Sequence, residues 1–366
     1  MSVYFADEKI HINLSEHCLK VIELDRLSHG IYGDEKSITG FINKIFTNFY
    51  GESKANVSYQ VSKKKKEIED SLSQKEYSHI SDADKNKLIN NLLNKYKEEL
   101  IKENSSYPKF FGKKYRINNE NQDIIEDLDE EIEYAGSVGN FIKIILEEYS
   151  LLNPSERQRI YYKDIINVIE SAIISNRGIR IVQHTTIRKD ESDHSVTKPE
   201  TQKFEVKPYK IVANVAKDTL YVLGMARSER GRDKNISFKP RCFRIDMIQR
   251  ISDTGSFGDF ISSSNKIALD EAFNKYGPAM ENKIITVQVK FTQLGLERFS
   301  RIVHGRPNNF QKLSDDTYEF SCPKEIARNY FWRLMPEVTI ISPVELEEEF
   351  KYKAKEILDT KIDYLE

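Results

Sequence analysis

The chain has 366 residues, of which 39% are hydrophobic and 31% are charged, and its formal net charge is −2. This length allows two or three domains with buried cores, and the balanced charge excludes a polycation. No stretch approaches 18 consecutive apolar residues. The three cysteines are too far apart to predict a disulfide framework or a zinc site. We therefore expect a cytoplasmic protein with no membrane contact, metal or cofactor.

The N-terminal residues show the alternation of a half-buried strand. In Lys9-Ile-His-Ile-Asn-Leu14, the isoleucines and the leucine point one way, whereas Lys9, His11 and Asn13 point the other. Ser15 is expected to cap a helix over 16–29. Ser37 is expected to cap a second helix, whose apolar residues are spaced three and four apart. A strand followed by two helices resembles a ribbon-helix-helix unit.

The same pattern occurs a second time. Lys114-Tyr-Arg-Ile-Asn118 matches Lys9-Ile-His-Ile-Asn13, and Ser137-Val-Gly-Asn-Phe-Ile142 matches Ser37-Ile-Thr-Gly-Phe-Ile42. One interpretation is a tandem pair of units, 1–50 and 114–150, whose strands pair antiparallel within the chain. The other is one true unit and a helical lookalike. Between the copies, residues 51–113 are expected to form a helical insertion, with Lys63–Lys66 as a solvated face. Together these segments make an N-terminal domain over 1–154.

The middle of the chain is basic and rich in short strands. Residues 171–251 hold 17 Lys or Arg and 9 Asp or Glu, which indicates an anionic partner. A helix over 155–175 is followed by expected strands at 179–187, 204–212, 219–225 and 237–245. Three of these strands carry motifs: Pro208-Tyr209, Leu220-Tyr-Val222 and Arg241-Cys-Phe-Arg-Ile-Asp246.

These three motifs, in this order, resemble the WYL domain of bacterial regulators. The resemblance covers about 170–251 and implies a small Sm-like β-barrel within a domain over 155–255. A Gly- and Ser-rich linker is expected at 252–265. Residues 266–366 then show the order β-α-β-β-α-β plus one helix, which is ferredoxin-like and is similar to the extension that follows WYL domains. The expected fold class is α+β multidomain.

The sequence shows no catalytic constellation and no Gly-rich phosphate loop, so we do not expect an enzyme. Binding to an anionic ligand or nucleic acid is indicated instead, because arginine forks grip phosphates and aromatic faces stack bases. The candidate barrel site consists of Arg180, His184, Tyr209, Tyr221, Arg227, Arg241 and Arg244. Arg188, Arg230 and Arg232 lie near them in sequence. The alternative is an ordinary solvated barrel with Tyr221 and Phe243 in its core.

The ribbon offers a second candidate surface. Its expected outward-facing residues are Lys9, His11, Asn13, Lys114, Arg116 and Asn118. In ribbon-helix-helix proteins this face reads base edges in the DNA major groove. The alternative is a ribbon that serves only for assembly. The acidic helix at 126–133 would repel phosphates and weighs against DNA.

The combined architecture resembles the WYL-domain accessory proteins of type VI-D CRISPR loci. That resemblance implies a non-catalytic homodimer that binds single-stranded RNA and stimulates a CRISPR effector ribonuclease. DNA binding stays open on the motifs alone. A transcriptional regulator that binds operator DNA through its ribbon and a ligand through its barrel is the main alternative. A scaffold whose basic barrel docks an acidic protein is a third.

Overall fold

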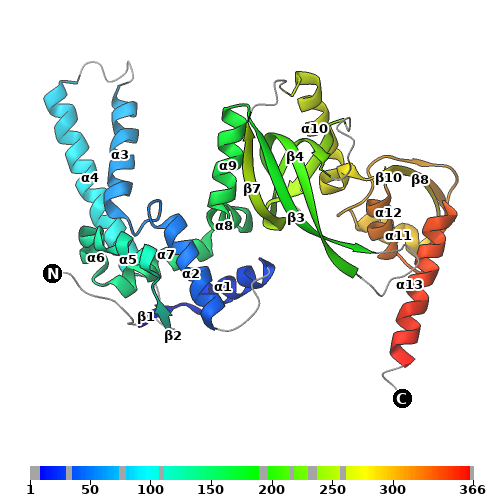
Figure 1. Ribbon diagram of the computed structural model, residues 1–366, viewed down its shortest axis with the longest axis horizontal. Coiled ribbons are helices and arrows are strands. Elements are labelled where there is room, and N and C mark those ends of the chain that lie inside the picture. Colours follow the sequence, from blue (N-terminus) through cyan, green and yellow to red (C-terminus); the bar gives the residue numbers. More distant parts are fainter. Residues whose placement is uncertain are drawn as a thin grey trace. The chain divides into compact units, whose positions relative to one another are not determined.

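The computed structural model describes residues 9–29, 35–73, 80–106, 111–188, 197–214, 218–229, 237–255 and 261–362. The chain divides into two compact units (Figure 1). Unit 1 comprises Met1–Asn167 and Val215–Leu220, and unit 2 comprises Val168–Asn214 and Tyr221–Glu366. The finer division into three domains stays a prediction. None of the described helices is both long and apolar enough to cross a membrane.

Unit 1 is built from helices around one two-stranded ribbon. Its first copy of the repeated pattern contains β1 (Lys9–Leu14), α1 (Glu16–Ser28) and α2 (Glu35–Phe49). The helical insertion forms the hairpin of α3 (Val57–Leu72) and α4 (Asp82–Ser105). The second copy contains β2 (Phe111–Arg116), α5 (Asn119–Glu126), α6 (Asp129–Ala135) and α7 (Val138–Leu151). The expected helix over 155–175 is two helices, α8 (Pro154–Tyr161) and α9 (Lys163–Ile174).

Two serines predicted from the sequence to begin helices in unit 1 act as N-caps, and a third does not. Ser15 and Ser137 accept hydrogen bonds from the backbone N–H groups of Cys18 and Asn140, as expected for N-caps. The expectation that Ser37 caps α2 is wrong, because α2 begins two residues earlier, at Glu35.

One hydrophobic core holds the two copies together. It takes Ile12 and Leu14 from β1, Tyr115 from β2, and the facing sides of α2 and α7, including Phe41 and Phe141. All five side chains are at most 2% exposed. Because neither copy could bury this much apolar surface alone, the pairing of the two copies creates the core of the unit.

The five-stranded antiparallel sheet of unit 2, called the sheet below, has the strand order β6-β5-β4-β3-β7. Its strands are β3 (Gly178–Arg188), β4 (Thr197–Asn214), β5 (Thr219–Ser228), β6 (Lys239–Arg244) and β7 (Ile248–Gly255). The expected closed barrel is not formed among the described residues. The short 3-10 turn η2 (Ile245–Met247) joins β6 to β7, but β6 pairs with β5 and β7 with β3, so both remain sheet edges.

From residue 283 onward, unit 2 follows the expected order of elements. After α10 (Ser263–Tyr276) and the 3-10 turn η3 (Gly277–Glu281) come β8 (Ile284–Phe291), α11 (Gln293–Arg301), β9 (Phe310–Lys312), β10 (Thr317–Pro323), α12 (Lys324–Trp332), β11 (Val338–Ser342) and α13 (Val344–Ile362). The sheet order β11-β8-β10-β9 is antiparallel throughout. Both ends of the expected linker at 252–265 belong to regular elements instead, with 252–255 in β7 and 263–265 in α10, whereas 256–260 lie outside the described residues.

Candidate nucleic-acid interface

The two repeated strands pair with each other within the chain. In the antiparallel register of β1 and β2, Lys9 lies opposite Arg116, His11 opposite Lys114, and Asn13 opposite Gly112. Directly opposed residues point to the same face of a sheet. This pairing therefore places the predicted ribbon residues of both copies side by side.

The ribbon face is exposed, whereas the residues that alternate with it are buried. Lys9, His11 and Asn13 on β1, and Lys114 and Arg116 on β2, are all exposed. We call these five residues the ribbon face. The sixth predicted residue, Asn118, lies beyond β2, where its side chain accepts a hydrogen bond from Asn121 N as the N-cap of α5. A Cβ on Gly112 would lie 2.5 Å from His11 Cε1, so the missing side chain makes room for the imidazole.

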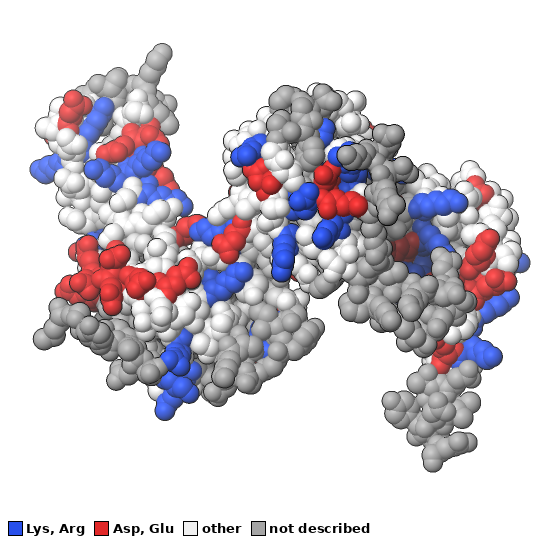
Figure 2. Space-filling model, in the orientation of Figure 1, with Lys and Arg blue, Asp and Glu red and all other residues white. Residues whose placement is uncertain are grey.

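The ribbon face carries positive charge. Neither Lys9 nor Lys114 forms an ion pair with any residue that the structure describes. In Figure 2, Lys and Arg atoms gather over the β1–β2 ribbon, and a band of Asp and Glu atoms covers α5 and α6. A polyanion bound at the ribbon would therefore be attracted on one side and repelled on the other.

The arginines predicted for the barrel have a different environment. Each one whose side chain is described contacts a carboxylate of unit 2. Arg227 lies 2.6 Å from Glu205, Arg241 lies 3.5 Å from Glu281, and Arg244 lies 2.5 Å from Asp246. Arg180 pairs with Glu229 in the same way. These four predicted arginines are thus already paired within the chain.

Aromatic rings accompany two of these arginines. The Arg241 guanidinium lies 4.8 Å from the centre of the Phe204 ring. Arg227 and Lys207 both lie 4.9 Å from the centre of the Phe238 ring. Burial raises the pKa of Glu281, the partner of Arg241, because it disfavours the charged carboxylate. The sheet therefore contains arginine–aromatic pairs that are already occupied by contacts within the chain.

The remaining predicted sheet residues are buried, hydrogen-bonded within the chain, or outside the described residues. Tyr221 is 2% exposed and packs against Phe273, which differs from the expectation of a surface contact. Phe243 is also buried in the core. The Tyr209 hydroxyl donates to Asp270 over 3.1 Å. The backbones of His184 and Arg188 lie in β3, but their side chains, like Arg230 and Arg232 as a whole, are outside the described residues.

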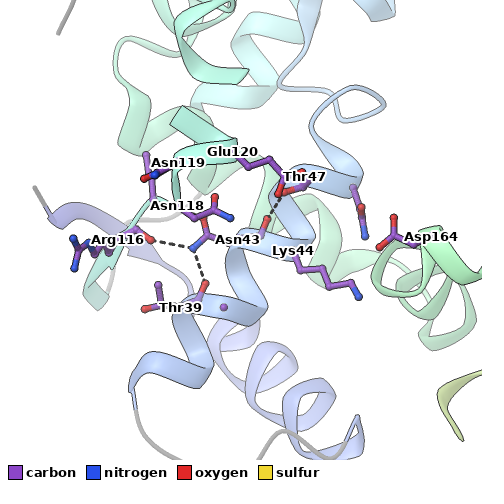
Figure 3. A pocket seen from close by; sticks show the side chains of 12 residues that line it. Thr39, Asn43, Lys44, Thr47, Arg116, Asn118, Asn119, Glu120 and Asp164 are labelled. Atoms are coloured by element: carbon purple, nitrogen blue, oxygen red, sulfur yellow. Dashed lines mark hydrogen bonds between the residues drawn. The ribbon is translucent and has the colours of Figure 1, made fainter. Parts of the chain in front are cut away.

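A groove beside the ribbon was not predicted from the sequence. It has a volume of about 850 Å³ and is lined by one side of α2, by residues 116–120 and by Asp164 (Figure 3). Side chains from α2 include those of Thr39, Asn43 and Lys44. In Figure 3 the Arg116 side chain points away from the groove, and its backbone carbonyl points toward Asn43. We call this cavity the α2 groove.

The floor of the α2 groove is a closed network of amides. Asn43 Nδ2 donates to the carbonyls of Thr39 and Arg116 over 2.9 and 3.0 Å. Asn43 Oδ1 accepts from Asn118 N and from Asn121 Nδ2 over 3.0 and 2.8 Å. Asn43 and Asn121 are 6% and 0% exposed. Because the hydrogen-bonding capacity of the Asn43 amide is fully used, the floor is rigid before any ligand arrives.

A comparison with solved structures finds a match along nearly the whole chain. A protein described as a CRISPR Cas-related protein has a crystal structure that matches 98% of this chain and 95% of its own, with a TM-score of 0.72 and 19% sequence identity. At this identity the likeness shows a shared fold.

A second match is partial. Proteasome accessory factor B/C of Arthrobacter aurescens covers 59% of this chain and 31% of its own length, at 13% identity. Its TM-score of 0.27 is too low to support an argument. No model of a known protein family matches the chain, and no curated protein matches its sequence significantly.

Proposed function

We propose that this chain is a CRISPR-associated accessory protein, without catalytic activity of its own, that binds single-stranded RNA and stimulates an RNA-guided ribonuclease. Two independent lines support the proposal. The WYL and ribbon-helix-helix resemblance of the sequence points to the accessory proteins of type VI-D loci. The shared fold along 98% of the chain links it to a protein described as CRISPR Cas-related.

The observation that carries nucleic-acid binding is the ribbon face. It brings Lys9, His11, Lys114 and Arg116 together on one exposed surface, from positions about a hundred residues apart in the chain. Lysine and arginine provide most of the affinity for phosphate backbones. The sheet arginines are a weaker candidate surface, because a phosphate would first have to displace Glu205, Glu281 or Asp246.

A single strand fits this surface better than a duplex. A rigid duplex on the ribbon would bring many phosphates near the acidic residues of α5 and α6, which include Asp123, Glu126 and Glu130. A flexible single strand can follow the ribbon and avoid this region. The same acidic residues make the operator-binding regulator less favourable.

The homodimer implied by the resemblance belongs to the same proposal. Helix α13 offers a surface for it, because Val344, Tyr352, Ile357 and Leu358 are 41–64% exposed. Apolar side chains gathered on one exposed helix are typical of interaction surfaces.

The class of nucleic acid can be tested directly. Fluorescence anisotropy of labelled single-stranded RNA, single-stranded DNA and duplex DNA should give the tightest binding for the RNA, with affinity that falls as salt rises. The protein should also accelerate RNA cleavage when added to the RNA-guided ribonuclease encoded in the same locus. Tighter binding of duplex DNA, without stimulation of cleavage, would favour the regulator. Absence of binding to all three would contradict the proposal.

A further inference from the structure

The two halves of unit 1 are related by sequence but differ where helix meets ribbon. Helix α7 packs closely on β1, because Gly139 brings its backbone to the His11 carbonyl. A Cβ on Gly139 would lie only 2.7 Å from that oxygen. The equivalent seam between α2 and β2 instead contains the α2 groove. The seam between α7 and β1 is therefore closed, and the seam between α2 and β2 is open.

The size and stiffness of the α2 groove suit a small organic ligand. A volume of about 850 Å³ lies in the range of ligand-binding cavities. The Asn43–Asn121 network fixes its floor, and Thr47 Oγ1 extends the network by donating to Asn121 Oδ1 over 2.7 Å. A preformed site loses little conformational entropy when it binds.

The charges along the groove rim select against a phosphate. Glu120 and Asp164 contribute two carboxylates, and neither forms an ion pair with a described residue. Lys44 is the cation that lines the groove with its side chain, and its ammonium group lies 4.6 Å from the centre of the Tyr161 ring. Carboxylates only accept hydrogen bonds when ionised. A neutral ligand with N–H donors therefore fits this rim best.

The groove adjoins the ribbon face through Arg116. The carbonyl of this residue accepts from Asn43 in the groove, and its position on β2 lies opposite Lys9 on the ribbon. Because the Arg116 side chain belongs to the ribbon face and points away from the groove, a strand whose phosphates lie on that face would reach the groove by turning one base past Arg116. Single-stranded RNA presents unstacked bases that a protein can bind by their edges, whereas a duplex keeps them paired.

From this geometry we infer that the α2 groove holds one unpaired nucleobase that carries an exocyclic amino group. Glu120 or Asp164 accepts from the amino group, as carboxylates do from cytosine N4, and the amide of Asn119 is available for the rest of the base edge. Uracil presents a carbonyl oxygen in place of the amino group, and the carboxylates repel it. This inference rests on the proposed binding of single-stranded RNA and adds a base preference to it.

The test compares labelled oligo(C) with oligo(U) of equal length by fluorescence anisotropy, because cytosine and uracil differ mainly in the amino group. The wild type should bind oligo(C) at least about fivefold more tightly. Gly40→Phe should remove this preference while keeping the ribbon-dependent affinity, because Gly40 lines the groove and faces open space. Gly51→Phe is the matched control, because Gly51 also has open space but does not line the groove.

A second variant keeps the shape of the groove and changes its chemistry. Glu120→Gln combined with Asp164→Asn should raise the affinity for both oligomers, because two negative charges are removed, and should reduce the preference for oligo(C). Equal binding of both oligomers by the wild type would overturn the inference but leave the proposed function intact. The inference also fails if the preference survives in both groove variants. Absence of binding to either oligomer would overturn the proposed function, and the inference with it.

Discussion

At the scale of single residues, a buried ion pair connects α1 to the start of α8. Arg157 donates to Asp25 through Nε and Nη2 over 2.6 and 3.1 Å, and Tyr149 Oη donates to the same carboxylate over 2.8 Å. The side chains of Asp25 and Arg157 are each 12% exposed. Because Asp25 satisfies two partners that are remote in sequence, it ties both copies of the repeated pattern to the helix that follows them.

Asp25→Ala should lower the free energy of unfolding by about 3–5 kcal/mol, because it leaves a buried guanidinium without its counter-charge. Chemical denaturation of the full chain measures this change. Glu16→Ala is the matched control on the same helix. Glu16 pairs with Lys20, but both side chains are more than 60% exposed, and such surface pairs contribute little. Equal effects of the two substitutions would show that the Asp25 network does not stabilise unit 1.

Residue patterns predicted the ribbon face better than the sheet site. Alternation in Lys9–Leu14 was sufficient to assign each side chain to a face, and the structure confirms that assignment. The partners of the sheet arginines were harder to predict, because Glu205, Glu229 and Glu281 lie on other segments. One signal was present in the sequence: Arg244 and Asp246 are two residues apart, close enough to pair with each other.

At the scale of elements, the contact between α7 and β1 depends on one glycine. Gly139→Ala should destabilise the protein by about 1–3 kcal/mol, because the new Cβ would overlap the His11 carbonyl and force α7 away from the ribbon. Gly40→Ala in α2 is the matched control. Its Cβ meets nothing within 4 Å, so it should stabilise the helix by about 0.5–1 kcal/mol.

Thermal unfolding measures the stability of each alanine variant relative to the wild type. The structure predicts opposite signs, because Gly139 lies against the ribbon and Gly40 faces open space. A loss of stability for both variants, or for neither, would contradict the close contact between α7 and β1 at Gly139.

The order of elements was largely predictable, but their pairing was not. The strand, helix and strand order after residue 283 follows from local periodicity and is confirmed. The prediction of a closed barrel was wrong. Closure depends on hydrogen bonds between β6 and β7, which no local sequence pattern encodes. The α2 groove was missed for a similar reason, because residues 39–48, 116–120 and 164 meet only in the folded unit. The frequent asparagines in the first two of these segments were its only local signal.

At the scale of the whole molecule, composition alone gives no sign of the proposed nucleic-acid binding. The net charge of −2 conceals a positive ribbon beside acidic helices, and a sheet on which Arg180, Arg227, Arg241 and Arg244 are paired with carboxylates. Function therefore depends on how the fold distributes charge. The fold shared with a CRISPR Cas-related protein covers nearly the whole chain, so the ribbon and the sheet both belong to the shared architecture.

The most direct test of the account measures single-stranded RNA binding by three double variants at two salt concentrations. Lys9→Ala/Lys114→Ala should weaken binding about tenfold and reduce the salt slope by about 0.7 for each phosphate that no longer meets a lysine. Lys63→Ala/Lys66→Ala removes the same charge from the exposed face of α3 and should leave binding unchanged. Arg241→Ala/Arg244→Ala, on the sheet, should weaken binding less than the ribbon variant does. Wild-type affinity in the ribbon variant, together with abolished binding in the sheet variant, would contradict the account and move the site to the sheet.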